Sequence, residues 1–228
     1  ALPEGSFDLV IMGHCLNELW RGKPEALDRR SALLRRAARS LAPGGRILIL
    51  EPALLVTSRE LIALRDRLVG EGWRVLSPCP GSYPCPILAA GSERSCHAES
   101  PWTPGEPMAS LAATAGLDRD SVKCAYFFLS PPSQASPFEG GQVGLRRVVS
   151  DPMLNKAGRL RYILCGEAAL QTISARADNE AAREAGFMVL SRGDSFRLSG
   201  FEERPGGGLG FVRGSSFELL TRAPETTI

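Results

Sequence analysis

The chain contains 228 residues, of which 43% are hydrophobic and 23% are charged, and its formal net charge is +2. This composition excludes a fully disordered chain and suits one large domain, or one domain with a small addition. The longest apolar runs, such as 47–50 and 125–129, are far shorter than the roughly 20 residues that cross a bilayer. We therefore expect a globular protein without a membrane span.

The positive charge of the chain is almost entirely arginine, since only three of its 27 basic residues are lysine. The planar guanidinium group of arginine can make bidentate hydrogen bonds to phosphates and can stack on bases. Pairs such as Arg29-Arg30, Arg35-Arg36 and Arg146-Arg147 are therefore candidate phosphate contacts. Two alternatives explain these arginines without phosphate binding. A GC-rich genome favours arginine codons, and any one pair can simply lie on the solvent-exposed face of a helix.

The first part of the chain alternates between predicted strands and predicted helices. The predicted strands are 7–13, 46–51 and 73–76, and the predicted helices are 24–41 and 57–69. Such alternation indicates a parallel sheet covered by helices, with a site beyond the carboxyl ends of the strands. Those ends hold residues 14–18 and the pair Glu51-Pro52.

The next part begins with a stretch rich in Pro, Gly, Ser and Cys, Pro78 to Pro107, which has no periodicity. A loop of this length is usually functional or disordered. A short helix at 108–115 and a strand at 121–129, which returns to the sheet, are predicted after it. Residues 131–141 have the composition of a linker.

The tail consists of short alternating segments separated by glycines, which predicts a small β-barrel or β-sandwich. The predicted segments are 147–150, 159–165, 170–176, 188–190, 195–198 and 210–213. We therefore divide the chain into an α/β part (1–130), a linker (131–142) and a β-rich part (143–228).

The α/β part resembles the second half of the Rossmann-like methyltransferases that use S-adenosylmethionine. The resemblance rests on Asp8 at the start of a strand, on the Leu-Ala-Pro-Gly-Gly turn at 41–45 and on the hydrophobic strand after it. It implies that the loop after Gly13 lines the cofactor pocket. The candidate cofactor contacts are His14, Asn17 and Glu18. A helix-entry loop with satisfied polar groups explains these three residues equally well.

The chain lacks the glycine-rich motif with which this family binds its cofactor. No G-x-G-x-x-G lies between a strand and a helix, and the glycine run 206–210 falls in the tail. The first residues do not have the pattern of a signal peptide, and we expect that residue 1 begins partway through the domain. The chain would then hold half of a cofactor pocket. An α/β sheet without a cofactor is the alternative.

Three of the six cysteines lie in the long loop, in two Cys-Pro pairs and one Cys-His pair: Cys79, Cys85 and Cys96. Nothing marks the chain as secreted, so clustered cysteines indicate a metal or redox chemistry rather than disulfides. Prolines stiffen the loop, and a metal keeps thiolates charged. A fourth ligand must come from elsewhere in the chain, and His97 or Cys165 could supply it.

The order of the motifs narrows the resemblance. The chain resembles the methyltransferase-like family linked to the small subunit of the mitochondrial ribosome, which has bacterial relatives. The resemblance rests on the order of five segments: 13–19, 41–45, Glu51-Pro52, the cysteine series and 126–129. This resemblance implies that four cysteines hold a [4Fe-4S] cluster. Carried over to this sequence, they are Cys79, Cys85, Cys96 and Cys165. Ser95 and Ala98 stand where the family usually has aromatic residues. A four-thiolate set suits zinc as well.

The same resemblance implies an assembly or translation factor of the small ribosomal subunit that binds ribosomal RNA. Its location would be the bacterial cytoplasm or the mitochondrial matrix. Two alternatives stay open, an active S-adenosylmethionine-dependent methyltransferase acting on RNA or protein and a zinc-stapled binding module. No acceptor-activating residue can be singled out. Cys15 and Cys124 are expected to be small apolar residues of the core.

Overall fold

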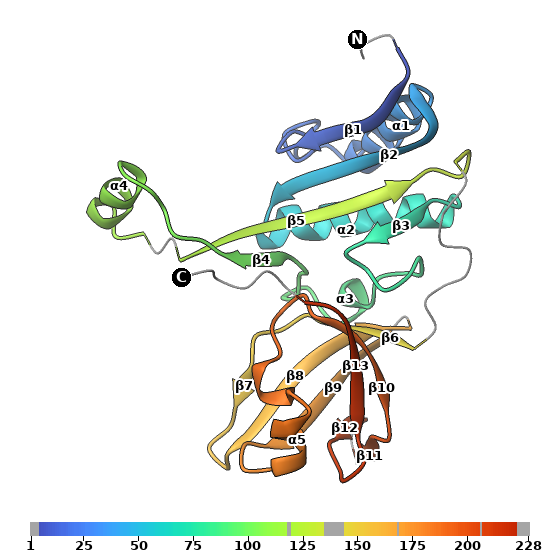
Figure 1. Ribbon diagram of the computed structural model, residues 1–228. Helices are drawn as coiled ribbons and strands as arrows, with labels where there is room; N and C mark the ends of the chain where they lie inside the picture. The colour runs from blue at the N-terminus through green and yellow to red at the C-terminus, as the bar shows by residue number, and fades with distance from the viewer. Residues whose placement is uncertain (1–4, 118–119, 135–143, 168, 206, 223–228) are drawn as a thin grey trace.

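The computed structural model describes residues 5–117, 120–134, 144–167, 169–205 and 207–222. Within these ranges the chain forms two sheets, each with its own hydrophobic core (Figure 1). The strands of the first sheet lie between residues 7 and 130, and those of the second lie between 145 and 221. The mixed α/β class is as predicted. No helix in the described ranges is long and apolar enough to cross a membrane.

The first sheet has the strand order β1-β2-β5-β3, with β4 beside β5. Its strands are β1 (Phe7–Gly13), β2 (Leu41–Pro52), β3 (Arg74–Ser77), β4 (Ala98–Pro101) and β5 (Ser121–Ser130). β1 and β2 are parallel, whereas β5 is antiparallel to β2, β3 and β4. The three strands of the predicted alternation, β1, β2 and β3, run in the same direction. The sheet as a whole is mixed rather than parallel as predicted, because the returning strand β5 enters between β2 and β3 in the opposite direction.

Two helices, α1 (Ala26–Ala38) and α2 (Leu55–Gly70), pack on the same face of this sheet (Figure 1). Side chains of β2 alternate between buried and half-buried, which is the period of a strand with one face on a core. Ile47 and Leu129 of the sheet and Leu34 and Leu68 of the helices have no exposed surface. Residues of 24–41 and 57–69 thus form helices as predicted, within a few residues at each end.

The Pro-Gly-Gly segment is not a turn ahead of the strand, as predicted, but a bulge within β2. Phe7 pairs with Leu41 and Leu9 pairs with Arg46, so residues 42–45 have no partners in the ladder with β1. A Cβ atom on Gly45 would lie 2.8 Å from the carbonyl oxygen of Phe7. Glycine is therefore required where the bulge meets β1.

The long loop carries regular structure that its composition did not predict. It contains helix α3 (Pro86–Ala89) and strand β4, and α4 (Met108–Thr114) follows it close to the predicted position. Most of the loop is thereby attached to the first sheet: α3 contacts α2, and β4 pairs with β5.

The second sheet runs in the order β11-β12-β9-β8-β6-β10-β13, with β7 beside β8. Its strands are β6 (Leu145–Val148), β7 (Met153–Leu154), β8 (Arg159–Gly166), β9 (Ala169–Arg176), β10 (Ser195–Ser199), β11 (Glu202–Arg204), β12 (Gly208–Gly210) and β13 (Ser216–Thr221). The sheet is curled, as Figure 1 shows, and β11 and β13 are its two ends in the described part of the chain. The predicted β-rich tail is present as one open curled sheet.

Two short helices, α5 (Glu180–Glu184) and η1 (Phe187–Val189), help to fill the core of the curled sheet. Phe187 packs edge-on against Tyr162, with ring centroids 5.3 Å apart. The predicted strand at 188–190 is therefore wrong, since a single 3-10 turn directs Phe187 into the core. Of the predicted linker, only residues 131–134 are among those that the structure describes.

Candidate metal centre and interdomain cleft

Helix α2 fixes the backbone of the cysteine loop through two adjacent residues. The guanidinium of Arg65, 1% exposed, donates to the carbonyl oxygens of Gly81, at 2.8 Å, and Tyr83. It is also ion-paired with the carboxylate of Asp66 at 2.6 Å. That carboxylate accepts the backbone N–H of Cys85 at 3.0 and 3.1 Å. The start of the loop is therefore held by charge-assisted hydrogen bonds from a buried helix.

The loop places three predicted ligands against the first core, and the second sheet supplies the fourth. Cys79 follows β3, Cys85 immediately precedes α3, and Cys96 lies two residues before β4. All three are half-buried and pack on the first core. Cys165 belongs to β8 of the second sheet and is 8% exposed.

The four thiols lie close enough to influence one another. Burial raises the pKa of Cys79 and Cys165 to about 12 and that of Cys85 to about 11. Charge on the other thiols raises these pKa values further, and Cys165 is affected by all three cysteines of the loop. The thiols of the loop and Cys165 thus affect one another electrostatically although they come from two sheets. With these pKa values Cys79, Cys85 and Cys165 are protonated at neutral pH, and a metal binding there would release protons.

In chemical terms, the donor set fits the expected group. Four thiolates suit a zinc ion or an iron–sulfur cluster. Within the ranges that the structure describes, however, no group of three or more His, Cys, Asp or Glu side chains stands in a metal-binding arrangement. The thiols are neighbours without being at ligand separations, so ligation by these four cysteines stays a prediction.

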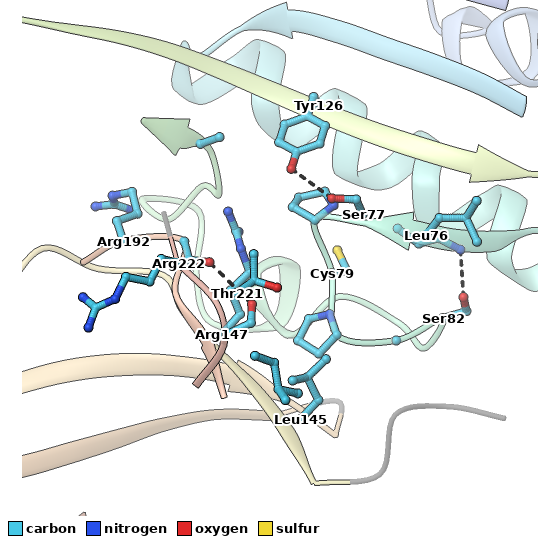
Figure 2. A pocket seen from close by; sticks show the side chains of 18 of the residues that line it. Leu76, Ser77, Cys79, Ser82, Tyr126, Leu145, Arg147, Arg192, Thr221 and Arg222 are labelled. Atoms are coloured by element: carbon cyan, nitrogen blue, oxygen red, sulfur yellow. Dashed lines mark hydrogen bonds between the residues drawn. The ribbon is translucent and has the colours of Figure 1, made fainter. Parts of the chain in front are cut away.

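A cleft of about 1030 Å³ lies between the two sheets (Figure 2). Its walls come from β3, β4 and β5 on one side and from β6, β10 and the end of β13 on the other. Cys79 and Arg147 both line it. At the side of the first sheet, the hydroxyl groups of Tyr126 and Ser77 are hydrogen-bonded at 3.0 Å, as Figure 2 shows.

An ionic network beside the cleft joins the two sheets. Arg192, next to β10, lies 3.1 Å from Asp151 and 3.8 Å from Glu99 of β4. Glu99 is also paired with Lys123 of β5 at 3.0 Å. His97, the other residue considered as the fourth ligand, has its Nε2 atom 3.8 Å from Glu99. Burial and the charge of Arg192 lower the pKa of His97, so this imidazole favours its neutral form.

The predicted cofactor contacts lie at the carboxyl end of β1. His14 is exposed with a φ of 52°, and its backbone N–H donates to Leu50 O at 2.8 Å. The side-chain amide of Asn17 donates to the carboxylate of Glu18 at 2.9 Å. The structure thus brings Asn17 and Glu18 together and leaves His14 on the surface.

Glu51, at the end of β2, is the residue to which sequence reasoning gave no role. Its side chain is 1% exposed and accepts the backbone N–H groups of Leu16 at 2.8 Å and Asn17 at 3.3 Å. Burial raises its pKa. The cavity beside it is about 10 Å³, room for one water molecule. The signal was a carboxylate at the end of an otherwise apolar, buried strand.

The arginine pairs divide between surface and interior. Arg30 is 4% exposed and ion-paired with Glu60 at 2.7 Å, and Arg147 is 5% exposed, so neither belongs to an exposed basic surface as expected. Arg146 is paired with Glu167 at 2.8 Å. The pair Arg35-Arg36 is exposed, and its first member is paired with a glutamate of the loop after α2.

The two remaining cysteines are half-buried rather than fully buried. Cys15 packs against the first core. Cys124, in β5, lines the cleft. The expectation that both are small apolar core residues therefore holds more closely for Cys15.

Comparison with known protein families matches residues 2–171 to the family described as "Mitochondrial small ribosomal subunit Rsm22". The matched range includes the first sheet, the cysteine loop and the second sheet as far as β9, and so all four predicted ligands. No curated protein matches the chain.

Proposed function

Since this chain belongs to the Rsm22 family, described as mitochondrial small ribosomal subunit Rsm22, we propose that it is a methyltransferase-like assembly or translation factor of the small ribosomal subunit. In this role it binds ribosomal RNA and holds a [4Fe-4S] cluster. It would work in the mitochondrial matrix, or in the cytoplasm of a bacterium.

The observation that carries the cluster proposal is the gathering of four thiols from two sheets, with electrostatic effects between them. Cys79, Cys85, Cys96 and Cys165 are the ligands in this proposal. A metal group bound there ties the loop of the first sheet to β8 of the second, because Cys165 is 69 residues beyond Cys96 in the sequence. Closing so long a loop by metal bonds stabilises the two parts together.

The RNA proposal is supported by the exposed basic face of α1. Arg29, Arg35, Arg36 and Arg39 are exposed on this helix or directly after it. Two of them are held by glutamates, Arg29 at 3.3 Å and Arg35 at 2.7 Å. Such arginines offer bidentate contacts to phosphates.

The test of the metal centre is anaerobic purification followed by iron, sulfide and zinc analysis, together with a visible absorption spectrum. We expect equal amounts of iron and sulfide and a brown protein. Cys124→Ser is the matched control, because this thiol lines the same cleft and is not in the ligand set. A colourless protein that contains zinc would show that the four cysteines bind a zinc ion instead of an iron–sulfur cluster. A protein without either metal contradicts the centre.

The test of RNA binding is the affinity for ribosomal RNA of the small subunit, measured over a range of salt concentrations. Phosphate contacts release counterions, so affinity should fall steeply with salt. A flat salt response contradicts the RNA proposal and leaves codon usage as the explanation of the arginines.

Methyl transfer is a second candidate function. It is favoured by the carboxyl ends of the parallel strands β1 and β2, where α/β sheets commonly bind ligands, and where Asn17 meets the buried carboxylate of Glu51. S-adenosylmethionine would supply the methyl group. Titration of the full-length protein with this cofactor, followed by assay of methyl transfer to ribosomal RNA, separates this candidate from an assembly role.

A further inference from the structure

Arg147 is a buried cation placed directly beside the fourth cysteine. In the antiparallel ladder between β6 and β8, Arg147 is the register partner of Cys165. Partners in a ladder project their side chains to the same side of the sheet. Arg147 also lines the cleft together with Cys79, on the wall formed by the second sheet (Figure 2).

Arg147 differs from the other buried arginines in its partners. Arg30 and Arg65 each lie within 2.7 Å of a carboxylate oxygen. The side chain of Arg147, which is 5% exposed, makes no hydrogen bond or ion pair within the part of the chain that the structure describes. A cation removed from water without an anion nearby is costly, so an interior arginine of this kind calls for negative charge in its surroundings.

Negative charge would reach Arg147 from thiolates bound to a metal. Arg147 lies opposite Cys165 in the ladder and lines the cleft with Cys79, so it faces one predicted ligand from each sheet. Four thiolates around a divalent ion carry a net charge of about −2, which must be offset in an interior site. Arg65, the other buried cation near these thiols, is already paired with Asp66 and donates to loop carbonyls, so it positions the loop.

We infer that Arg147 is the counter-charge of the four-cysteine centre, an interior cation on β6 that offsets the negative charge of metal-bound thiolates. This inference rests on the proposed metal centre and adds a residue outside its ligand set. The centre then has one buried cation from each part of the chain: Arg65 on helix α2, which packs on the first sheet, and Arg147 on strand β6 of the second sheet.

The first measurement is the rate at which anaerobically purified protein releases its metal to a chelator. Loss of a group next to metal ligands typically weakens metal binding by about 10- to 100-fold, so Arg147→Met should release metal at least about tenfold faster than the wild type. Arg147→Lys keeps the charge and should stay close to the wild type. Arg161→Met, an exposed arginine of β8, is the matched control and should release metal at the wild-type rate.

The second measurement separates a counter-charge from a packing role, because the two predict opposite signs. After removal of the metal, Arg147 is a buried cation facing neutral thiols, so Arg147→Met should raise the melting temperature of the metal-free chain. A side chain that only fills space would lower the melting temperature with or without metal. If the metal-free chain does not fold, the metal-release rates alone decide between the two roles.

Three outcomes overturn the inference. The first is an unchanged rate of metal release in Arg147→Met. The second is a faster release that Arg147→Lys shares, which indicates a shape requirement. The third is stabilisation of the metal-free wild type, but not of Arg147→Met, by inorganic phosphate, which makes Arg147 a receptor for an anion in the cleft. A wild-type protein that contains no metal overturns the proposed centre itself, and is therefore distinct from these three.

Discussion

The carboxyl edge of β1 and β2 and the cleft between the sheets both contain buried charge, but they satisfy it differently. At the edge, the backbone of the next loop donates two N–H groups to Glu51, and the cavity left is about 10 Å³. At the cleft, the cavity is about 1030 Å³, and Arg147 has no carboxylate partner within the described residues. Both N–H groups reach the Oε1 atom of Glu51, and its buried Oε2 atom has no hydrogen-bond partner among the described residues. The carboxylate is thus held by its own backbone through one oxygen, whereas Arg147 has a large cavity and two predicted ligands beside it, which favours a bound group at the cleft.

The largest expected effect comes from removing the ligand that belongs to the second sheet. Cys165→Ser should lose at least about nine-tenths of the bound metal, because three thiolates and a hydroxyl bind it far more weakly. It should also lower the stability of loop and tail together. Metal per chain after anaerobic purification is the measurement.

Cys124→Ser and Cys15→Ser are the controls for this change, since both thiols are half-buried and outside the ligand set. They should keep their metal and cost about 1 kcal/mol of stability. Full metal in Cys165→Ser would make His97 the leading fourth ligand and zinc the more credible metal.

A smaller effect is expected from Gly166, which follows Cys165 where β6 and β8 approach closely. A Cβ atom there would lie 2.5 Å from Leu145 O and 2.7 Å from the Cδ atom of Arg146. Gly166→Ala should therefore separate the two strands and cost about 1–3 kcal/mol, measured by urea unfolding. Gly70→Ala, with no atom within 4 Å of the added methyl group, should be neutral or slightly stabilising. Equal stabilities of the two variants would show that the strands adjust freely.

The edge of the first sheet should respond to pH. The pKa of Glu51 is raised by burial, so its contribution to stability is present below the unfolded pKa of about 4.3 and is lost as pH rises through the folded pKa. Glu51→Gln should therefore gain stability relative to the wild type as pH rises from about 4 to 7. Urea midpoints over this range are the measurement.

Glu167 provides the opposite slope for comparison. Its hydrogen bond to Arg146 lowers the pKa of this carboxyl group, so its contribution is lost as pH falls through the folded pKa. Glu167→Gln should be less stable than the wild type at neutral pH, and its stability should approach that of the wild type in acid.

Parallel curves of stability against pH for the wild type and Glu51→Gln would contradict the assignment of a raised pKa to Glu51.

The smallest effect concerns RNA and distinguishes the surface from the interior of α1. Arg36→Ala should reduce the salt slope of RNA binding by about 1 without a loss of stability. Arg30→Met should leave that slope unchanged but lower the free energy of unfolding by about 1–3 kcal/mol, because the charge of Arg30 is bound to Glu60 and to a backbone carbonyl. The reverse pattern would place the RNA contact in the interior pair.

Local signals predicted the elements of the first sheet, since apolar runs such as 7–13 and 46–51 and the spacing of leucines in α1 and α2 are properties of short segments. The antiparallel insertion of β5 was not predictable in this way, because its partners β2 and β3 are set by contacts across about 50 to 80 residues. The prediction for Arg146-Arg147 shows a related limit. Neighbouring residues of a strand face opposite sides of the sheet, so such a pair is never one patch once the segment is a strand.

The candidate site was predictable in its residues but not in its surroundings. The Cys-Pro and Cys-His pairs are visible in the sequence, and so is Cys165 at the end of an alternating run. The cleft, the support from Arg65 and Asp66, and the position of Arg147 opposite Cys165 arise only when the two sheets meet.

The position of Cys165 in the chain also determines when, during translation, the fourth cysteine becomes available. The ribosome makes residues in order at roughly 5–20 per second, and early parts of a chain fold before later ones appear. The three cysteines of the loop and β5, which closes the first sheet, are complete by residue 130, whereas β8 ends at Gly166 and β10, the other neighbour of β6, ends at Ser199. For several seconds a nascent chain therefore holds three of the predicted ligands without the fourth, so the predicted centre can be completed only after β8 has been made.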